Sequence, residues 1–357
     1  MQFKKTGKPF CKRISDSECP YTGGGKNMQG NLCFGVAETV CRVLEGAGKP
    51  AYLVGGAVRD LLMGRTPQDW DVTTAALPEE TMALFAHTVP TGIAHGTITV
   101  ILDGVPVEVT TFRAETGYSD GRHPDAVRFG TTLQEDLARR DFTVNAMALR
   151  PLDGTLVDRF GGQRDLKEKR IRCVGDPVRR FEEDSLRIFR AVRFSAQLDF
   201  AIEPETQNAI FLCAERTKCL SGERVKAEMQ KLLLSDSPER AELLLRCGAL
   251  RPWGGENAAA DWKKLKEVPA DPIHRWRAFC QITGFPADTL PMERALRRGI
   301  LHPEDEVLHT LTITGGELYA LGLRGPEISA AQRKLTEHVM LHPEDNEKKT
   351  LLHLLNL

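Results

Sequence analysis

Residues 53–60 read Leu-Val-Gly-Gly-Ala-Val-Arg-Asp, the end of a short apolar strand that runs into two glycines and then into a helix. Because glycine has no Cβ, backbone N–H groups at Gly55 and Gly56 can approach a phosphate closely. Arg59, one turn into the predicted helix, adds a guanidinium that can clamp the same phosphate. A tight turn with a purely structural role is the alternative explanation of these glycines.

Two aspartates follow this turn. Asp69 and Asp71 are separated by one residue, and on a strand that spacing would place both carboxylates on one face. Adjacent carboxylates repel each other unless a cation lies between them, and paired Mg²⁺ ions roughly 3.5–4 Å apart align the oxygens of a phosphoryl displacement. We therefore predict a catalytic Mg²⁺ site at Asp69 and Asp71, with a solvated loop as the alternative. Glu108, between Val107 and Val109 on a predicted strand, is a candidate third catalytic carboxylate or a surface residue.

Arginines recur in two later stretches. Residues 139–146 read Arg-Arg-Asp-Phe-Thr-Val-Asn-Ala, a combination suited to binding a triphosphate and a ribose. A predicted helix over residues 179–198 carries a stripe at three-residue spacing, formed by Asp184, Arg187, Arg190 and Arg193. An aspartate can accept from the exocyclic amine of cytosine or adenine while an arginine donates to the ring nitrogen, which gives about 1–3 kcal/mol of discrimination. An ordinary salt bridge on a solvated helix is the alternative.

The periodicity changes along the chain. We predict a disordered extension over residues 1–30, because they lack a regular apolar pattern. Strands and helices then alternate to about residue 150, and nearly all the apolar spacing after residue 165 is helical. The elements expected are helices at 34–44, 179–198, 222–235 and 238–247, a helical unit at 312–341, a strand at 51–54, and a hairpin of 97–102 with 105–112 around Asp103-Gly104.

The bulk composition narrows the class of protein. The chain has 357 residues, a length that predicts about two to four domains. Its residues are 41% hydrophobic and 27% charged, and the formal net charge is −1. Because the whole chain is not basic, any RNA contact must come from a local basic face. Nine cysteines without a Cys-x-x-Cys pair indicate a reducing compartment. No stretch approaches the roughly 18 apolar residues of a membrane helix, so we expect a cytoplasmic protein with no membrane partner.

Taken together, these stretches resemble the class II tRNA nucleotidyltransferase/poly(A) polymerase family, which includes the CCA-adding enzymes. The resemblance runs in order through seven motifs, at residues 53–64, 68–74, 107–113, 135–149, 160–172, 180–194 and 221–233. A looser similarity covers residues 312–352. The resemblance implies an α+β fold, with a polymerase-β-like nucleotidyltransferase head of mixed sheet and flanking helices followed by an all-helical neck, body and tail. The expected limits are 1–30 for the extension, 31–150 for the head, 151–235 for the neck, 236–310 for the body and 311–357 for the tail.

The resemblance also implies roles for individual residues. Asp69 and Asp71 would bind Mg²⁺, and Gly55, Gly56 and Arg59 would bind the triphosphate. Five more residues would contact or select the nucleotide, namely Arg140, Asp184, Arg187, Arg190 and Arg193. The implied reaction is the addition of C, C and A to the 3′ end of tRNA from CTP and ATP, with release of pyrophosphate. The implied partners are tRNA, CTP and ATP, in a monomer or homodimer.

Three alternatives stay open. A poly(A) polymerase or a partial A-adding or CC-adding enzyme would share the head, but poly(A) polymerases carry a basic C-terminal extension and CC-adding enzymes lack a flexible loop. Residues 114–130 supply a polar loop with glycines, which favours retained A addition. Residues 236–310 match the family poorly, so tRNA contacts there are open. An inactive RNA-binding protein and a transferase acting on a small molecule are the more remote alternatives.

Overall fold

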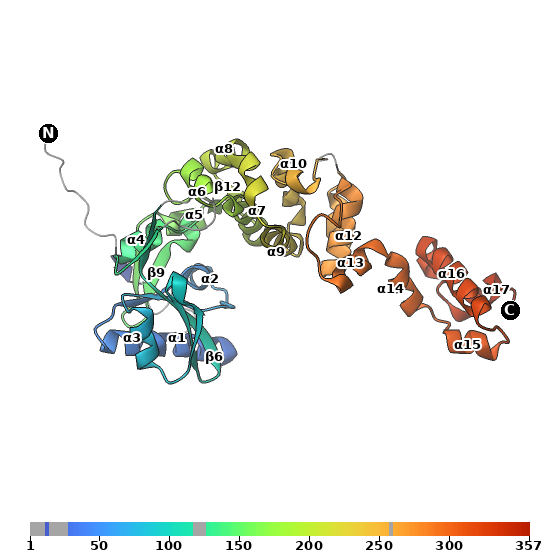
Figure 1. The fold of residues 1–357 in the computed structure, drawn as a ribbon, viewed down its shortest axis with the longest axis horizontal. Coiled ribbons are helices and arrows are strands. Elements are labelled where there is room, and N and C mark those ends of the chain that lie inside the picture. The colour runs from blue at the N-terminus through green and yellow to red at the C-terminus, as the bar shows by residue number, and fades with distance from the viewer. Residues whose placement is uncertain (1–10, 14–27, 117–125, 257–259) are drawn as a thin grey trace.

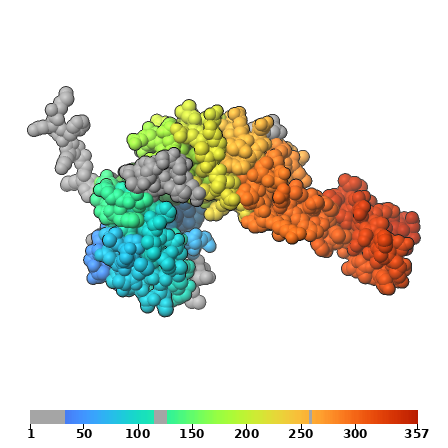
Figure 2. Space-filling model, in the orientation of Figure 1, coloured from blue at the N-terminus to red at the C-terminus, as the bar shows by residue number. Residues whose placement is uncertain are grey.

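The computed structural model describes residues 11–13, 28–116, 126–256 and 260–357. The chain forms an extended arc, with a sheet-containing head at one end and a small group of C-terminal helices at the other (Figure 1). The space-filling view shows that the helices between these ends leave the inner side of the arc open (Figure 2). No helix in the described part of the chain combines the length and apolar character needed to cross a membrane.

An eight-stranded mixed sheet organises the head, with the strand order β1-β10-β9-β2-β3-β6-β5-β4. Its strands are β1 (Cys11–Arg13), β2 (Ala51–Val54), β3 (Asp71–Thr74), β4 (Thr88–Gly92), β5 (Thr97–Leu102), β6 (Val105–Thr111), β9 (Met147–Arg150) and β10 (Thr155–Asp158). Strands β3 and β6 run parallel, and the other neighbouring pairs run antiparallel. The predicted mixed sheet is confirmed.

Helices cover both faces of this sheet. The helices are α1 (Met28–Gly46), α2 (Gly56–Leu62), α3 (Pro78–Leu84) and α4 (Leu133–Ala138). Apolar residues of α1 recur at helical spacing, and Val40 and Leu44 pack in one core with Val72 and Val107 of the sheet. On the other face, Leu137 of α4 packs with β2 and β9. Because side chains alternate along a strand, the odd-numbered residues of β3 face α4.

The β5–β6 hairpin closes with a two-residue turn. Its turn residues Asp103 and Gly104 have φ values of 51° and 76°, which is the positive-φ pair of a type I′ turn. The predicted hairpin is therefore confirmed, although β6 ends at Thr111. The parallel pairing of β3 with β6 then places Asp71 directly beside Glu108.

The remainder of the chain is almost entirely helical. The helices are α5 (Gly162–Lys167), α6 (Pro177–Glu183), α7 (Leu186–Leu198), α8 (Pro204–Cys213), α9 (Gly222–Leu233), α10 (Glu242–Arg246), α11 (Lys263–Glu267), α12 (Pro272–Thr283), α13 (Arg294–Leu301), α14 (Pro303–Thr310), α15 (Gly315–Ala320), α16 (Pro326–Leu341) and α17 (Lys348–Leu354). Two small sheets pair β7 (Arg113–Thr116) with β8 (Ala126–Phe129) and β11 (Arg170–Ile171) with β12 (Ala201–Ile202). One core extends from Phe142 to Ile300, and a separate core extends from Leu311 to Leu351. The segments predicted as neck and body thus share one core, whereas the tail has its own.

Three expectations require correction. Within the predicted extension, residues Cys11–Arg13 form strand β1, because backbone pairing needs no apolar pattern, and residues 28–30 begin helix α1. The other residues of 1–30 lie outside the described residues. The head does not end at residue 150, since β10 adds a further strand to its sheet. The predicted helix at 179–198 is two helices, because the chain is extended at Asp184 between α6 and α7.

Candidate active site

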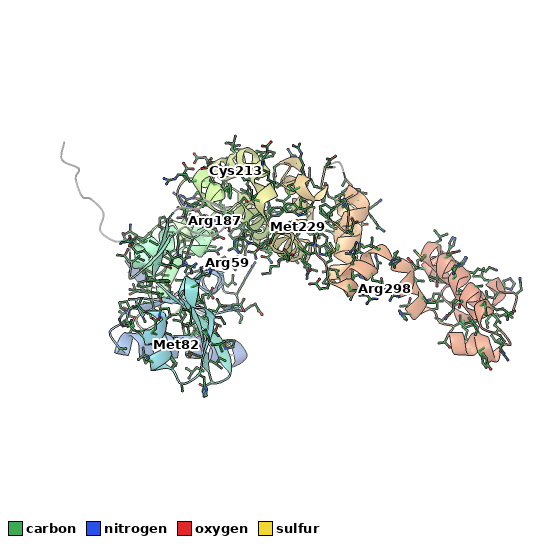
Figure 3. All side chains as sticks on the ribbon, in the orientation of Figure 1. Arg59, Met82, Arg187, Cys213, Met229 and Arg298 are labelled. Atoms are coloured by element: carbon green, nitrogen blue, oxygen red, sulfur yellow. The ribbon has the colours of Figure 1, made fainter. Side chains whose placement is uncertain are left out.

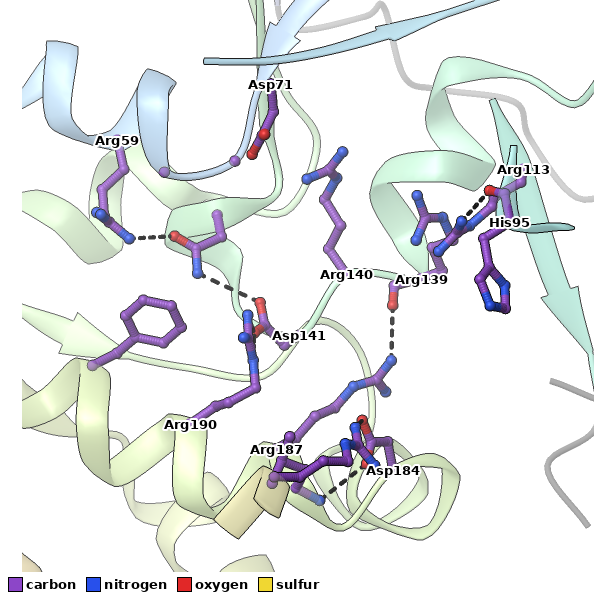
Figure 4. A pocket seen from close by; sticks show the side chains of 16 residues that line it. Arg59, Asp71, His95, Arg113, Arg139, Arg140, Asp141, Asp184, Arg187 and Arg190 are labelled. Carbon is purple, nitrogen blue, oxygen red and sulfur yellow. Dashed lines mark hydrogen bonds and ion pairs between the residues drawn. The ribbon is translucent and has the colours of Figure 1, made fainter. Parts of the chain in front are cut away.

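A cavity of about 530 Å³ lies between the head and the helices that follow it. Arg59 marks its head side and Arg187 its far side (Figure 3), and both side chains line the cavity (Figure 4). Three aspartates line it together with seven arginines, which are Arg59, Arg113, Arg139, Arg140, Arg187, Arg190 and Arg224. This excess of guanidinium groups suits a polyanionic ligand such as a triphosphate.

Two glycines form the floor of the cavity where β2 leads into α2. Gly55 has φ 70° and ψ −137°, a conformation that is essentially limited to glycine. A Cβ at Gly55 would lie 3.3 Å from Asp71 Oδ2 and 3.4 Å from Arg140 Nη1. The absence of a side chain therefore keeps open the space between a carboxylate and a guanidinium. Gly56 and Arg59 also line the cavity.

We expect Gly55→Ala to weaken CTP binding by about tenfold or more, because the new methyl group would occupy this space and the backbone would be strained. Gly64→Ala is the matched control, since Gly64 also has positive φ but a Cβ there would meet no atom within 4 Å. Isothermal titration with CTP, alongside thermal unfolding, measures both effects. Equal CTP affinities for the two variants would contradict the role of Gly55.

Asp71 lies beside these glycines, and the predicted carboxylates Glu108 and Asp69 lie near Asp71 but do not line the cavity. Asp71 is the first residue of β3 and pairs in register with Glu108 of β6. Since Val107 and Val109 are buried in the opposite face, Glu108 and Asp71 lie on the same side of the sheet. Asp69 does not share the strand, contrary to prediction, because β3 begins only at Asp71; it lies in an exposed bend before the strand.

The electrostatics show that these carboxylates are close to one another. Burial is the largest influence on Asp71 and raises its pKa to about 6. Arg140 opposes this rise, whereas the negative charges of Glu108 and Asp69 add to it. The ionised form of Asp71 is therefore poorly compensated by the protein alone.

This donor set fits a divalent metal that also binds the substrate. Among the described residues, no three or more His, Cys, Asp or Glu side chains are grouped so as to hold a metal ion by themselves. Mg²⁺ commonly binds through one or two carboxylates together with substrate phosphates. The under-compensated Asp71, beside Glu108 and facing the arginine-lined cavity, has the chemistry that such a site requires.

The raised pKa predicts that Asp71→Asn stabilises the metal-free protein. The pKa rises from 3.8 to about 6 on folding, so ionised Asp71 lowers the free energy of unfolding by about 2–3 kcal/mol above pH 6. Below pH 3.8 the carboxyl is protonated in both states and this cost disappears. Urea unfolding with EDTA should show Asp71→Asn more stable than wild type at pH 7.5, with a smaller difference at pH 5. A difference that is constant with pH would contradict this origin.

Asp184 and Arg187 reach the cavity from the junction of α6 and α7. Asp184 has φ −147° at the break between the helices, so the predicted single stripe is interrupted there. Its Oδ2 lies 2.9 Å from Arg224 Nη2. Arg187 donates from Nη1 to Glu183 Oε2 at 2.8 Å and from Nη2 to the carbonyl oxygen of Arg139 at 3.1 Å. Both side chains line the cavity and are held by neighbours.

The remaining two predicted arginines differ in position. Arg190 lines the cavity and donates from Nε to Asp141 Oδ2 at 2.8 Å. Burial alone would raise the pKa of Asp141, but Arg190, together with Arg187 and the backbone N–H of Phe142, lowers it. Arg193 is 8% exposed and does not line the cavity; it pairs with Glu228 at 2.6 Å and covers the ring of Phe194. Arg193 therefore supports the wall instead of forming its surface.

Several lining residues were not among the predicted site residues. They are His95, Arg113, Arg139, Asp141, Asn145, Leu186, Phe194 and Arg224. Asn145 accepts a hydrogen bond from Arg59 Nη1 at 2.8 Å, which fixes the phosphate-side guanidinium. Asp141 and Asn145 stand in the 139–146 motif, which the sequence predicts to bind a triphosphate and a ribose. Arg224 stands in the 221–233 motif, but its bond to Asp184 left no local signal, because Asp184 lies 40 residues earlier in the sequence.

Comparison with known proteins assigns this fold and site to a family. Residues 51–172 match the family model of the poly A polymerase head domain, and residues 199–253 match that of the probable RNA and SrmB-binding site of polymerase A. The CCA-adding enzyme of Anoxybacillus flavithermus is 41% identical over 85% of this chain and 78% of its own length. The chain belongs to the CCA-adding enzyme family. The resemblance drawn from the seven motifs is thereby confirmed.

Other members extend the comparison. The CCA-adding enzyme of Levilactobacillus brevis is 48% identical over 207 residues, so the matched part of this chain spans about half of that relative. The crystal structure of the Bacillus stearothermophilus CCA-adding enzyme in complex with CTP has 31% identity and a TM-score of 0.60, covering 91% of this chain and 97% of that one. The Thermotoga maritima CCA-adding enzyme complexed with tRNA shares the fold at 20% identity, with a TM-score of 0.63. Membership of this nucleotidyltransferase family implies the use of a divalent metal.

Proposed function

We propose that the chain adds C, C and A to the 3′ end of tRNA from CTP and ATP and releases pyrophosphate. The observation that carries this proposal is a single cavity lined by Gly55, Gly56 and Asp71, with Glu108 beside Asp71 in the sheet. Asp184 and Arg187, the residues predicted to read the base, line the same cavity. The names of the relatives support the same reaction, since they are CCA-adding enzymes and one was solved with CTP.

Different residues would bind the triphosphate and the metal during phosphoryl transfer. The triphosphate would lie over Gly55 and Gly56, where Arg59 and Arg140 neutralise its charge. Asp71 and Asp69 would hold Mg²⁺, with Glu108 beside them. Bound Mg²⁺ supplies charge neutralisation at the α-phosphate and lowers the pKa of the attacking 3′-hydroxyl. The protein contributes orientation, because Asn145 holds Arg59 and Asp136 holds Arg140 before the substrate arrives.

Base selection would occur at the opposite wall. The carboxylate of Asp184 can accept from the amine of cytosine or adenine, and Arg187 can donate to the adjacent ring nitrogen. Guanine and uracil present the reverse polarity and would leave both groups unpaired, which costs about 1–3 kcal/mol. The ion pair of Asp184 with Arg224 at 2.9 Å and the bonds that hold Arg187 keep this reading surface in place without a nucleic-acid template.

The test is gel-resolved incorporation onto a tRNA that ends at the discriminator base. We expect two residues to be added with CTP alone, none with ATP alone, and three with both. Long A tails would identify a poly(A) polymerase, and failure to add C would identify an A-adding specialist. RNA binding without any incorporation would identify an inactive RNA-binding protein.

The loop predicted at residues 114–130 bears on whether the chain adds A as well as CC. Strands β7 and β8 form a paired base at residues 113–116 and 126–129, and the part of the predicted loop at 117–125 lies outside the described residues. The support for A addition over a CC-adding enzyme is therefore the length and polar composition of residues 114–130 in the sequence. The cytoplasmic location and the monomeric or dimeric state stay predictions.

A further inference from the structure

Asp136 on α4 is completely buried beneath the arginines of the cavity. Its Oδ1 accepts from Nη2 of Arg139 at 2.8 Å, and its Oδ2 accepts from Nη2 of Arg140 and from Oγ1 of Thr73, both at 3.2 Å. The backbone N–H of Arg113 adds a longer contact at 3.4 Å. Burial alone would raise the pKa of Asp136, but the two arginines outweigh it and lower the pKa. This carboxylate therefore links β3, β7 and the two adjacent arginines.

Arg140 lies between two carboxylates. Its Nη2 is bonded to Asp136, while its Nη1 and Asp71 Oδ2 both flank the open space above Gly55. Its Nε is buried and finds no hydrogen-bond partner among the described residues. The guanidinium is thus tethered through its Nη2 end, and its other end lies near the carboxylate that would bind the metal (Figure 4).

We propose that Asp136 is a positioning residue that holds Arg140 back from Asp71, so that Asp71 stays available to a divalent cation. This inference rests on the proposed function. Without the Asp136 charge, the Arg140 guanidinium would turn toward Asp71 and compete with the metal for it. With that charge in place, Arg140 stays at the cavity wall, where it can bind phosphate.

The test measures binding of Mn²⁺ together with a non-hydrolysable CTP analogue, whose phosphates complete the metal site, from the electron paramagnetic resonance signal of the ion. The readout therefore does not depend on nucleotide incorporation. We expect Asp136→Asn to weaken the Asp71-dependent Mn²⁺ binding by about tenfold, as for other changes that act through a ligand's neighbours. In an Arg140→Gln background the same change should alter the affinity by less than about twofold, because the competitor is gone. Wild-type affinity in Asp136→Asn would overturn the proposal, as would an equal loss in both backgrounds.

Asp165→Asn is the matched structural control. Asp165 is 1% exposed and is paired with Arg172 at 2.8 Å, so it is an equally buried carboxylate that does not line the cavity. Its loss should lower the melting temperature but leave the Mn²⁺ affinity unchanged. If Asp136→Asn does not fold, the Arg140→Gln protein and the double variant still test the proposal, because a tenfold difference between them would overturn it.

The Asp71→Asn variant separates failure of the metal site from failure of this inference. Mn²⁺ binding that persists in Asp71→Asn would overturn the metal site and this inference together. Mn²⁺ binding that depends on Asp71 but ignores Asp136 would overturn this inference alone and leave the proposed reaction standing.

Discussion

Asp71→Asn is expected to lower nucleotide incorporation about a thousandfold or more while tRNA binding persists. The substitution keeps the size of the side chain but removes the charge that would hold the metal against the α-phosphate, and charge stabilisation of this kind is the largest contribution to such reactions. Single-turnover incorporation of CTP and filter binding of tRNA measure the two properties separately. Because the same substitution relieves an under-compensated carboxylate, the inactive protein should also be the more stable one.

A matched control separates this loss from general damage to the sheet. Asp103 lies in the β5–β6 turn at an exposed position with φ 51°, which asparagine tolerates well. Asp103→Asn should therefore retain wild-type incorporation. If Asp71→Asn still incorporated CTP at a wild-type rate, the assignment of the metal site would be wrong.

Arg190→Ala is expected to cost about 3 kcal/mol of folding stability. Asp141 is 8% exposed, and its Oδ2 lies 2.6 Å from Arg190 Nη2. Removal of Arg190 leaves the buried charge with the backbone N–H of Phe142 at 2.8 Å but without its ion-pair partner, and breaking a buried pair costs about 3–5 kcal/mol. Urea unfolding measures the loss, and Asp141→Asn in the same background should recover part of it, because the uncompensated charge is then gone.

Arg216→Ala provides the comparison at the surface. Arg216 pairs with Glu182 at 2.6 Å, but both side chains are about half exposed, and exposed pairs contribute about 0.2–1 kcal/mol. The two arginine substitutions should therefore differ in cost by about 2 kcal/mol or more. Equal losses would contradict the importance of burial at Asp141.

Local sequence patterns identified the parts of the fold and site that depend on neighbouring residues. The strand at 51–54, the glycines that end it and the type I′ turn at Asp103-Gly104 follow from short-range backbone preferences. The parallel register that places Asp71 beside Glu108 could not be read in this way, because it arises from two strands far apart in the sequence. The alternation around Glu108 nevertheless indicated the face on which it lies.

The features that the sequence analysis missed depend on contacts that local sequence patterns do not record. The break at Asp184 interrupts an apolar pattern that is continuous at helical spacing, so periodicity alone joined α6 to α7. Strand β1 is recruited by backbone hydrogen bonds to β10, which leave no side-chain signature. The role of Asp136 is likewise invisible in the sequence, since Thr73 and Arg140 reach it from different elements.

A crystal structure of the chain with CTP and Mg²⁺ tests the central claim most directly. It should show the triphosphate over Gly55 and Gly56, the metal between Asp71 and the α-phosphate, and the cytosine edge against Asp184 and Arg187. A nucleotide bound elsewhere, or one whose base points away from Asp184 and Arg187, would contradict the account.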